Sequence, residues 1–130
     1  MSRLIVWRHG NTDWNAGHRV QGQTDVPLNE LGHRQAVDAA ELLVRVRPDA
    51  IVASDLRRAA DTAAALAALT GLPVTPDERL RERHFGDWQG LTMAEVAATR
   101  PAEHARWTAG ADVVGGGVET LDDLGKRVAE

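Results

Sequence analysis

The sequence contains no cysteine, which excludes disulfide bonds, thiol nucleophiles and cysteine-based zinc sites. It also lacks a cationic stripe, because the formal net charge is -4 and basic residues are spread among acidic ones. A nucleic-acid-binding surface is therefore not expected, since such surfaces gather Lys and Arg on one face. The first apolar run, residues 4–7, is too short for a signal peptide or a membrane span. We expect a cytoplasmic protein with no nucleic-acid partner and no membrane partner.

The 130 residues are enough for one domain with a single core, and 43% of them are hydrophobic. Two short runs, residues 4–7 and 50–53, are apolar at successive positions, which is typical of strands buried on both faces of a parallel sheet. Helices are expected over residues 29–48 and 56–69, and a further short strand at residues 74–75. This order predicts an α/β fold, a three-layer αβα arrangement with a mostly parallel central sheet.

Capping signals mark where three of the helices begin. Asn29 is an N-cap candidate, and Thr92 and Thr120 stand at capping-box spacing from Glu95 and Asp123. The remaining expectations are a short helix starting at Pro101, a loop over residues 110–117 and a last helix that runs into Glu130 without a stop signal.

The strongest local signal is Arg8-His9-Gly10, directly after the first predicted strand. Ligands of open α/β sheets bind beyond the carboxyl ends of the strands, so these side chains would open onto a site. A neutral imidazole nitrogen can attack phosphorus, and a neighbouring guanidinium matches phosphate oxygens with a planar fork of donors. Taken alone, the tripeptide gives only weak support, since turns and surface histidines are common.

Two further segments carry residues suited to the same chemistry. Arg57 and Arg58 lie at the start of the helix after the second strand, where a helix N-terminus with an arginine on it is an anion site. The alternative is an ordinary N-cap with both arginines solvated. Glu82 is a general-acid candidate, because a carboxyl group crowded by other negative charge can stay protonated near a leaving-group oxygen. The alternative is a surface ion pair of Glu82 with Arg81 or Arg83.

These segments, in this order and with these spacings, resemble the histidine phosphatase superfamily, also called phosphoglycerate mutase-like, over nearly the whole chain. The tripeptide at residues 8–10 matches the signature of that family, with Asn15 at its usual offset. The resemblance implies that His9 is the nucleophile that becomes phosphohistidine. It also implies that Arg8 and Asn15 bind the phosphoryl oxygens.

The other two segments match the family in the same way. In the family's second motif the phosphate-binding arginine stands just before the alanine, which assigns that role to Arg58 and leaves Arg57 as its neighbour. The family's proton donor matches Glu82. The resemblance implies no cofactor and no metal, because arginines take the place of a cation, and the sequence has no carboxylate cluster or His-x-x-x-His spacing.

The loop over residues 17–31 looks like that of the phosphatase members, whereas the cofactor-dependent mutases typically place a tryptophan where Gln23 stands. Together with residues 54–59 and 85–90, it is similar to the glucosyl-3-phosphoglycerate phosphatases. His84 could line the pocket, and the alternative is that it is a capped histidine with a structural role in a loop. The residues expected to contribute to substrate binding besides the phosphate ligands are Gln21, Gly22, Thr24 and His84.

The family completes its site with a second histidine, in a His-Gly step at the end of a later strand, and no such step follows residue 10 here. Because the last predicted helix runs uncapped into Glu130, we expect residues 1–130 to form a single histidine phosphatase domain that is incomplete at its C-terminus and lacks one or more strands. An open sheet edge with an exposed apolar face would then favour a homodimer. Loss of one charge-stabilising donor would lower the rate by about 10²–10³.

The sequence thus predicts a phosphomonoester hydrolase that acts on a small phosphorylated metabolite, with glucosyl-3-phosphoglycerate or a related sugar or glycerate phosphate as the candidate substrate. Two alternatives stay open. A mutase would return the phosphoryl group from phosphohistidine to the substrate instead of to water. A phosphate-binding module without catalysis is compatible with the absent second histidine.

Overall fold

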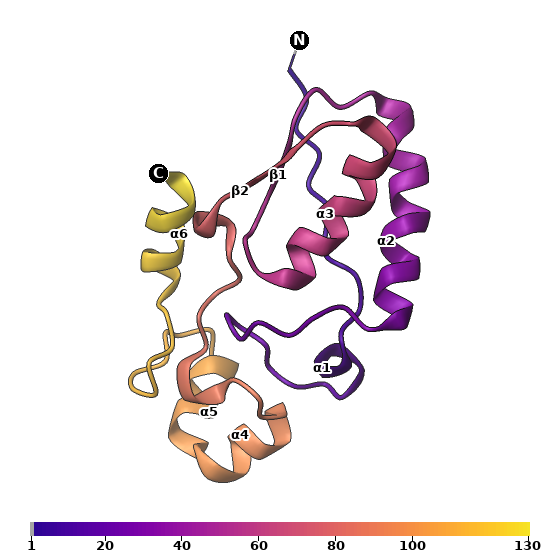
Figure 1. Cartoon of the computed structure of the whole chain (residues 1–130). Coiled ribbons are helices and arrows are strands. Elements are labelled where there is room, and N and C mark those ends of the chain that lie inside the picture. The colour runs from indigo at the N-terminus through magenta and orange to yellow at the C-terminus, as the bar shows by residue number, and fades with distance from the viewer. Residues whose placement is uncertain (1) are drawn as a thin grey trace.

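A short parallel sheet organises the first part of the chain in the computed structural model, which describes residues 2–130 (Figure 1). Strand β1 (Ile51–Ala53) pairs with β2 (Val74–Pro76) in parallel, the start of one opposite the start of the other. Parallel neighbours need a crossover connection, and helix α3 (Arg57–Thr70) supplies it. Both strands confirm the expectation from the sequence, and the parallel pairing with a helical crossover confirms the α/β class.

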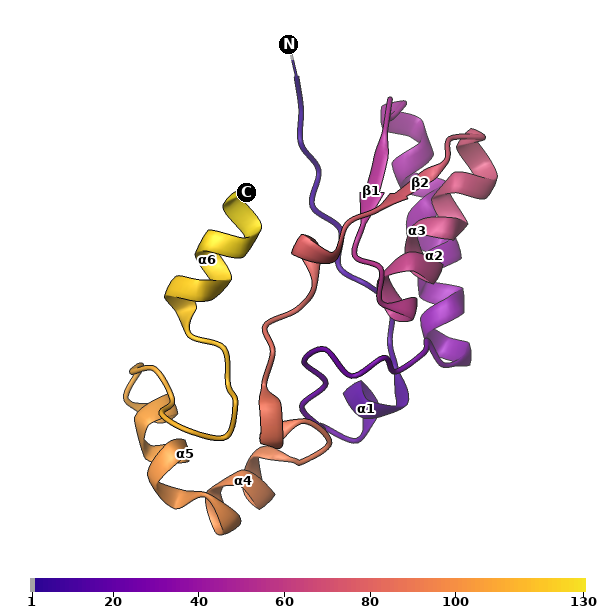
Figure 2. The same ribbon diagram turned by 60° about the vertical axis from the view of Figure 1, so that its left-hand side comes forward.

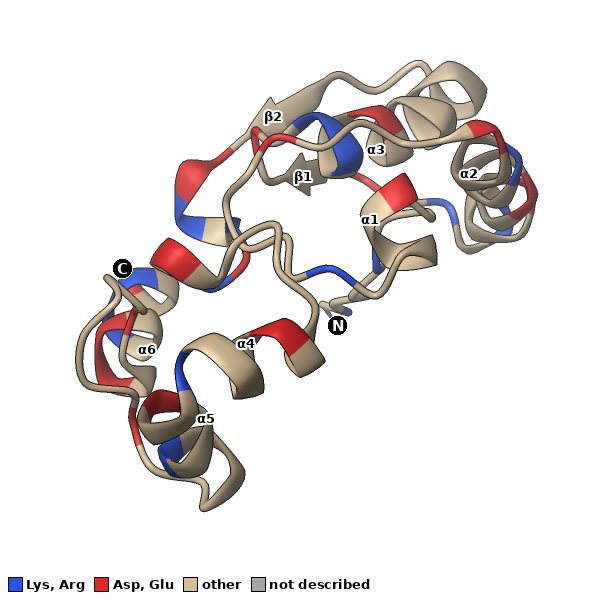
Figure 3. Cartoon of the chain, turned by 90° about the horizontal axis from the view of Figure 1, so that it is seen from below, with Lys and Arg blue, Asp and Glu red and all other residues tan. Residues whose placement is uncertain are grey.

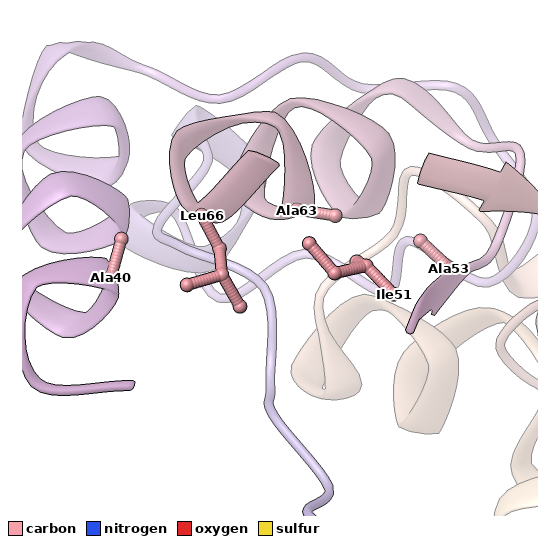
Figure 4. Close-up of a cluster of buried hydrophobic side chains, with 5 residues drawn as sticks. All are labelled: Ala40, Ile51, Ala53, Ala63 and Leu66. Atoms are coloured by element: carbon pink, nitrogen blue, oxygen red, sulfur yellow. The ribbon is translucent and has the colours of Figure 1, made fainter. Parts of the chain in front are cut away.

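Helices α2 (Glu30–Leu43) and α3 lie side by side on one face of this sheet (Figure 2). The predicted cap is confirmed, because the Asn29 side chain accepts a hydrogen bond of 2.8 Å from the amide of Gly32. Gly71 ends α3 in the left-handed conformation, with φ of 74°. Burying an aliphatic side chain stabilises the fold by roughly 1.5–3 kcal/mol. The core between helices and sheet consists of Ala40, Ile51, Ala53, Ala63 and Leu66 (Figure 4).

The first predicted strand, residues 4–7, does not form. Leu4 and Val6 are both 88% exposed, and neither β1 nor β2 pairs with this segment in the described part of the chain. Only Trp7 packs against the core. A strand buried on both faces needs a hydrogen-bonded ladder and cover on each side, and these residues have neither here. The prediction was therefore wrong for this segment. A homodimer formed through an open sheet edge and its exposed apolar face stays a prediction.

A second cluster of buried residues forms around Trp88, next to helices α4 (Met93–Thr99) and α5 (Pro101–Thr108). Trp88 is fully buried, and its Nε1 donates a 3.0 Å hydrogen bond to Glu103 Oε2. Trp107 of α5 lies edge-on to Trp88, with 5.6 Å between ring centroids. The predicted helix starts after Thr92 and at Pro101 are both confirmed. This cluster anchors the segment that follows Glu82.

The last helix, α6 (Leu121–Ala129), follows a long loop and runs back toward the level of β2 (Figures 1 and 2). Its predicted cap is confirmed, because the Thr120 side chain accepts a hydrogen bond from the amide of Asp123 at 3.1 Å. The elements that the sequence did not predict are all short, namely α1 (Asp13–Ala16) and the 3-10 turns η1 (Val44–Val46), η2 (Glu78–Leu80) and η3 (Gly86–Trp88). Within residues 2–130, no helix has the length and hydropathy to cross a bilayer.

Candidate active site

His9 follows the extended N-terminal segment, and its side chain is half-buried. Its Nδ1 lies 2.6 Å from the carbonyl oxygen of Gly10. A carbonyl oxygen only accepts hydrogen bonds, so Nδ1 carries the proton of the neutral ring and Nε2 keeps its lone pair. His9 thus presents an unprotonated nitrogen of the kind that attacks phosphorus.

Burial and the two neighbouring arginines favour the neutral form of the His9 ring. Burial lowers the pKa of His9, and the Arg58 and Arg8 guanidinium groups lower it further. The hydrogen bond to Gly10 and the charge of Glu82 act in the opposite direction but do not cancel the change. Because such effects fall off with distance, the three predicted side chains lie close enough to His9 to act on its charge. The charges of Arg8, Arg58 and Glu82 thus all act on His9, and the roles of these three residues in phosphate binding and proton transfer stay predictions.

Arg58 is buried at the start of α3, with 2% of its surface exposed. Its guanidinium donates from Nη1 to the carbonyl oxygen of Thr24 at 2.8 Å and from Nη2 to that of Gly22 at 2.5 Å. Burial lowers the pKa of Arg58, and the Glu82 carboxylate offsets part of that change. Arginine still stays charged at neutral pH, because its ordinary pKa is so high. Arg58 thus brings a buried positive charge to His9 while it holds the neighbouring loop.

The preceding arginine has a different environment. The Arg57 side chain is 60% exposed and pairs with Asp25 at 3.5 Å. Figure 3 shows the charged residues of α3 gathered at one end of the helix, and only Arg58 among them is buried. The solvated alternative therefore holds for Arg57 and is wrong for Arg58. No side-chain cap forms at Leu56, the residue before the helix, so the ordinary N-cap reading is also wrong.

Asn15 is oriented by the turn that contains it. The amide of Thr12 donates to Asn15 Oδ1 at 3.0 Å, and the amide of Asn15 donates to Thr12 Oγ1 at 3.1 Å. With Oδ1 occupied, the group that Asn15 can offer to a ligand is Nδ2, which only donates. Thr12 Oγ1 also lies 2.6 Å from Oε1 of the buried Gln21. The capping box therefore presents a donor next to His9 and ties it to the following loop.

Two residues that hold the backbone at His9 escaped the sequence reasoning. The amide of Gly10 donates to Thr62 Oγ1 at 3.0 Å, and that hydroxyl donates to the carbonyl oxygen of Arg58 at 2.6 Å. A Cβ atom on Gly32 would collide with the carbonyl oxygen of Asn11, so only glycine fits there. A glycine inside a predicted helix was the available signal for Gly32. Thr62 gave none, because its partner lies 52 residues away.

Gln89 also escaped the sequence reasoning, and it joins the loop at residues 21–24 to the segment that follows Glu82. Its Oε1 accepts hydrogen bonds from the amides of Gln23 at 2.9 Å and Phe85 at 3.2 Å. Its Nε2 donates to Thr24 Oγ1 at 3.1 Å. The predicted substrate-binding residues Gly22 and Thr24 thus sit between Arg58 on one side and Gln89 on the other.

Glu82 is exposed and makes no ion pair with its neighbours. Arg81 instead binds Asp55, with Nε 2.7 Å from Oδ1, and the buried Arg83 lies 3.6 Å from Asp112. The ion-pair alternative for Glu82 is therefore wrong. Its Oε1 accepts a 3.0 Å hydrogen bond from the amide of Arg83, which orients one carboxyl oxygen and leaves the other for a ligand.

His84 lies outside the groove beside His9. Its amide donates to Glu119 Oε1 at 3.1 Å, and its carbonyl oxygen accepts from the amide of Glu119 at 2.8 Å. Its Nδ1 is buried without a hydrogen-bond partner. These contacts agree with the alternative reading of a loop histidine, and they give no support to the predicted role of His84 in substrate binding.

An open groove of about 730 Å³ runs past His9. Of the predicted site residues, Arg8, His9 and Asn15 line this groove, whereas Gln21, Gly22, Thr24, Arg58, Glu82 and His84 do not. Within residues 2–130, no three His, Cys, Asp or Glu side chains are grouped as metal ligands. The rest of the groove lining is made by Trp7, Gly10, Asn11, Trp14, His18, Arg19, Gln35, Ala36, Ala39, Thr62 and Met93.

A comparison with protein families identifies the relationship that the site suggests. Residues 4–130 match the family described as histidine phosphatase superfamily (branch 1). The chain belongs to the histidine phosphatase superfamily. The match includes all three segments that the sequence predicts to carry the chemistry.

Curated relatives and solved structures support the same placement of this histidine phosphatase chain. It is 50% identical over 125 residues to the glucosyl-3-phosphoglycerate phosphatase of Mycolicibacterium vanbaalenii, covering 96% of this chain and 56% of the relative. It is 40% identical over 133 residues to the metal-independent phosphoserine phosphatase of Arabidopsis thaliana, covering 98% and 55%. A solved mycobacterial glucosyl-3-phosphoglycerate phosphatase in complex with VO3 superposes with a TM-score of 0.84 at 51% identity, covering 92% and 60%. The chain thus spans little more than half the length of these relatives.

Replacing Gln89 by leucine should loosen the loop of this histidine phosphatase chain at residues 21–24. The amides of Gln23 and Phe85 would lose their acceptor, and each half-buried group left unsatisfied costs about 1 kcal/mol, the low end of the range for buried groups. We expect the free energy of unfolding to fall by about that amount and these two amides to exchange faster with deuterium. Gln89→Glu is the matched control, because it keeps the acceptor oxygens and should show the smaller effect. Equal amide exchange in both variants would show that the Gln89 acceptor oxygen does not hold this loop.

The lowered pKa of His9 gives a second expectation for the histidine phosphatase site. The ring should lose its proton below 6.5, the ordinary value, so the nucleophile stays neutral into mildly acidic solution. An NMR titration of the His9 ring in phosphate-free protein measures this midpoint directly. The acid limb of kcat/KM, which reports essential groups of the free enzyme, should lie below the same pH. A midpoint at or above 6.5 would show that burial and the arginines do not control this ring.

Proposed function

We propose that this chain carries the phosphoryl-transfer centre of a metal-independent phosphomonoester hydrolase that works through phosphohistidine at His9. The substrate that we propose is a small phosphorylated metabolite, with glucosyl-3-phosphoglycerate or a related sugar or glycerate phosphate as the first candidate. The names of the relatives support this class, since two of them are phosphatases of small phosphorylated molecules. No cofactor enters the scheme.

The observation that carries the proposal is the state of His9. Its Nδ1–H is engaged by the Gly10 carbonyl oxygen, and its pKa is lowered by burial and by two arginines. Together these features leave Nε2 with a lone pair at neutral pH, beside positive charges that can stabilise a phosphoryl group.

The proposed reaction has two steps that share the same groups. In the first, His9 Nε2 forms a bond to phosphorus, the ester P–O bond breaks, and the leaving oxygen takes a proton from the Glu82 carboxyl group. In the second, Glu82 takes a proton from water, the water oxygen bonds to phosphorus, and the P–N bond breaks to release inorganic phosphate. Arg8, Arg58 and the Asn15 amide would hold the phosphoryl oxygens throughout.

The test is to incubate the purified protein with a ³²P-labelled phosphomonoester, quench it with alkali, and look for an alkali-stable, acid-labile label on His9. We expect label on His9, release of free phosphate, and a rate that does not change when a metal chelator is added. A protein that takes up no label acts as a phosphate-binding module instead. Isomerised phosphoglycerate without free phosphate would identify a mutase, and loss of activity on chelation would reject the metal-independent scheme.

A further inference from the structure

The proposed proton donor stands on a segment that does not hold itself in place. Glu82 follows the short turn η2 and precedes η3, and it belongs to neither a helix nor a strand. Fixing the backbone of such a residue costs conformational entropy. A general acid must nevertheless lie within hydrogen-bond distance of the leaving-group oxygen. Contacts from elsewhere in the fold therefore have to set the position of this carboxyl group.

Arg127 on α6 makes three contacts to the backbone of this segment. Its Nη1 donates to the carbonyl oxygens of Arg79 at 2.7 Å and Arg81 at 2.9 Å, and its Nη2 donates to that of Glu82 at 3.4 Å. Its Nε and Nη2 bind the two carboxylate oxygens of Glu119 at 3.0 and 2.9 Å. These five hydrogen bonds match the five N–H donors of a guanidinium, so none is left for another role.

Glu119 fixes Arg127 and reaches the same segment from a second direction. Its Oε1 also accepts a hydrogen bond from the amide of His84, and its carbonyl oxygen accepts from Arg83 Nε at 2.6 Å. Arg127 is the leading cause of a lowered pKa of Glu119, so the carboxylate is ionised at neutral pH. The fork-to-fork pair is thus a preorganised unit, with both partners mostly screened from solvent.

We propose that Arg127, oriented by Glu119, is a positioning residue that holds the Glu82 carboxyl group in place for proton transfer. This role rests on the function proposed above, because Arg127 can serve proton transfer only if Glu82 protonates the leaving group. Gln23 Nε2 donates to the Glu82 carbonyl oxygen at 3.3 Å from the loop beside Arg58. The backbone of Glu82 is therefore held between the phosphate-binding side of the site and α6.

The leaving group of the substrate separates this role from a merely structural one. p-Nitrophenolate leaves without a proton, whereas benzyl alcohol needs one, and the two esters are similar in size. In Arg127→Met we expect kcat on benzyl phosphate to fall by about 10²-fold, the low end of what general acid catalysis contributes, and kcat on p-nitrophenyl phosphate to fall far less. Glu82→Gln should show the same split. The double variant should lose little more than either single variant, because both remove one function.

Two further variants provide the controls. Lys126→Met removes a neighbouring charge of α6 that pairs with the exposed Asp122, and it should behave like the wild type on both esters. Arg127→Lys keeps a positive charge on α6 but not the fork, so it should fold and restore only part of the rate on benzyl phosphate. Deuterium exchange of the amides at residues 79–84 should rise in Arg127→Met and stay unchanged in Lys126→Met.

The possible outcomes distinguish a failure of the positioning role of Arg127 from a failure of the proposed phosphatase function. A split in Glu82→Gln that is absent from both Arg127 variants overturns the positioning role alone, as does unchanged amide exchange at residues 79–84. Equal losses on the two esters in Arg127→Met and Arg127→Lys also overturn it, since a structural defect does not sense the leaving group. A wild-type protein that releases phosphate from neither ester rejects the proposed function itself.

Discussion

Replacing His9 by asparagine should remove phosphate release almost completely, with kcat/KM falling by at least about 10³-fold. The amide of asparagine can still donate to the Gly10 carbonyl oxygen, as His9 Nδ1 does, but it offers no nucleophilic nitrogen. Arg8 and Asn15 remain in the groove, so inorganic phosphate should still bind. Phosphate release under single-turnover conditions and isothermal titration with phosphate measure the two properties separately.

The matched control for His9 is His33→Asn on α2. His33 is exposed and takes no part in the contacts around the groove beside His9, so the same substitution there should leave phosphate release unchanged. Both variants should unfold at similar urea concentrations, because within residues 2–130 the His9 side chain makes a single hydrogen bond. Wild-type hydrolysis by His9→Asn would remove the enzymatic assignment altogether.

Replacing Arg58 by methionine should have the second-largest effect, because this side chain serves the chemistry and the fold together. Loss of one charge-stabilising group should lower kcat by about 10²–10³-fold. The carbonyl oxygens of Gly22 and Thr24 would also lose their donors, which costs about 1–3 kcal/mol for each group left buried. The pKa of His9 should rise, since Arg58 is one of the charges that lower it. Phosphate-release kinetics, urea unfolding and NMR titration of His9 measure these changes.

Arg57→Met is the control that the sequence itself supplies. The two arginines are adjacent and identical, yet Arg57 is exposed and its ion pair with Asp25 is of a kind worth about 0–1 kcal/mol. We expect Arg57→Met to keep the wild-type rate and the wild-type titration of His9. Similar losses in both variants would mean that net charge near the site matters and the buried guanidinium does not.

The site of this histidine phosphatase chain depends on contacts between segments that are far apart in the sequence. His9, Arg58 and Glu82 come from three distant stretches, and α3 joins two of them through the Thr62 bridge to Gly10. The loop at residues 21–24 then lies between Arg58 and Gln89. A change in any of these supports should therefore alter the site without removing one of its chemical groups.

Some of this protein could be predicted from the sequence because the interactions concerned are local. The helix starts at Asn29, Thr92 and Thr120 each depend on a side chain that caps an amide three residues further on, so the signal and its effect lie in one short stretch. The strand at β1 and the tripeptide at residues 8–10 were visible for the same reason. The choice of Arg58 over Arg57 came from family resemblance, and burial in the structure agrees with it.

The tertiary structure alone decided the rest, because the remaining interactions join residues far apart in the chain. Residues 4–7 have the composition of a strand, but a strand also needs a neighbour, and composition does not supply one. Gln89 and Arg127 look like ordinary polar residues in the sequence, and their partners include Gln23 and Glu82, which lie 66 and 45 positions away. The sequence by itself determined where helices begin and which groups can do chemistry. Only the folded path of the chain decided which of those groups meet, since hydrogen bonds act over about 3 Å in space whatever the separation along the chain.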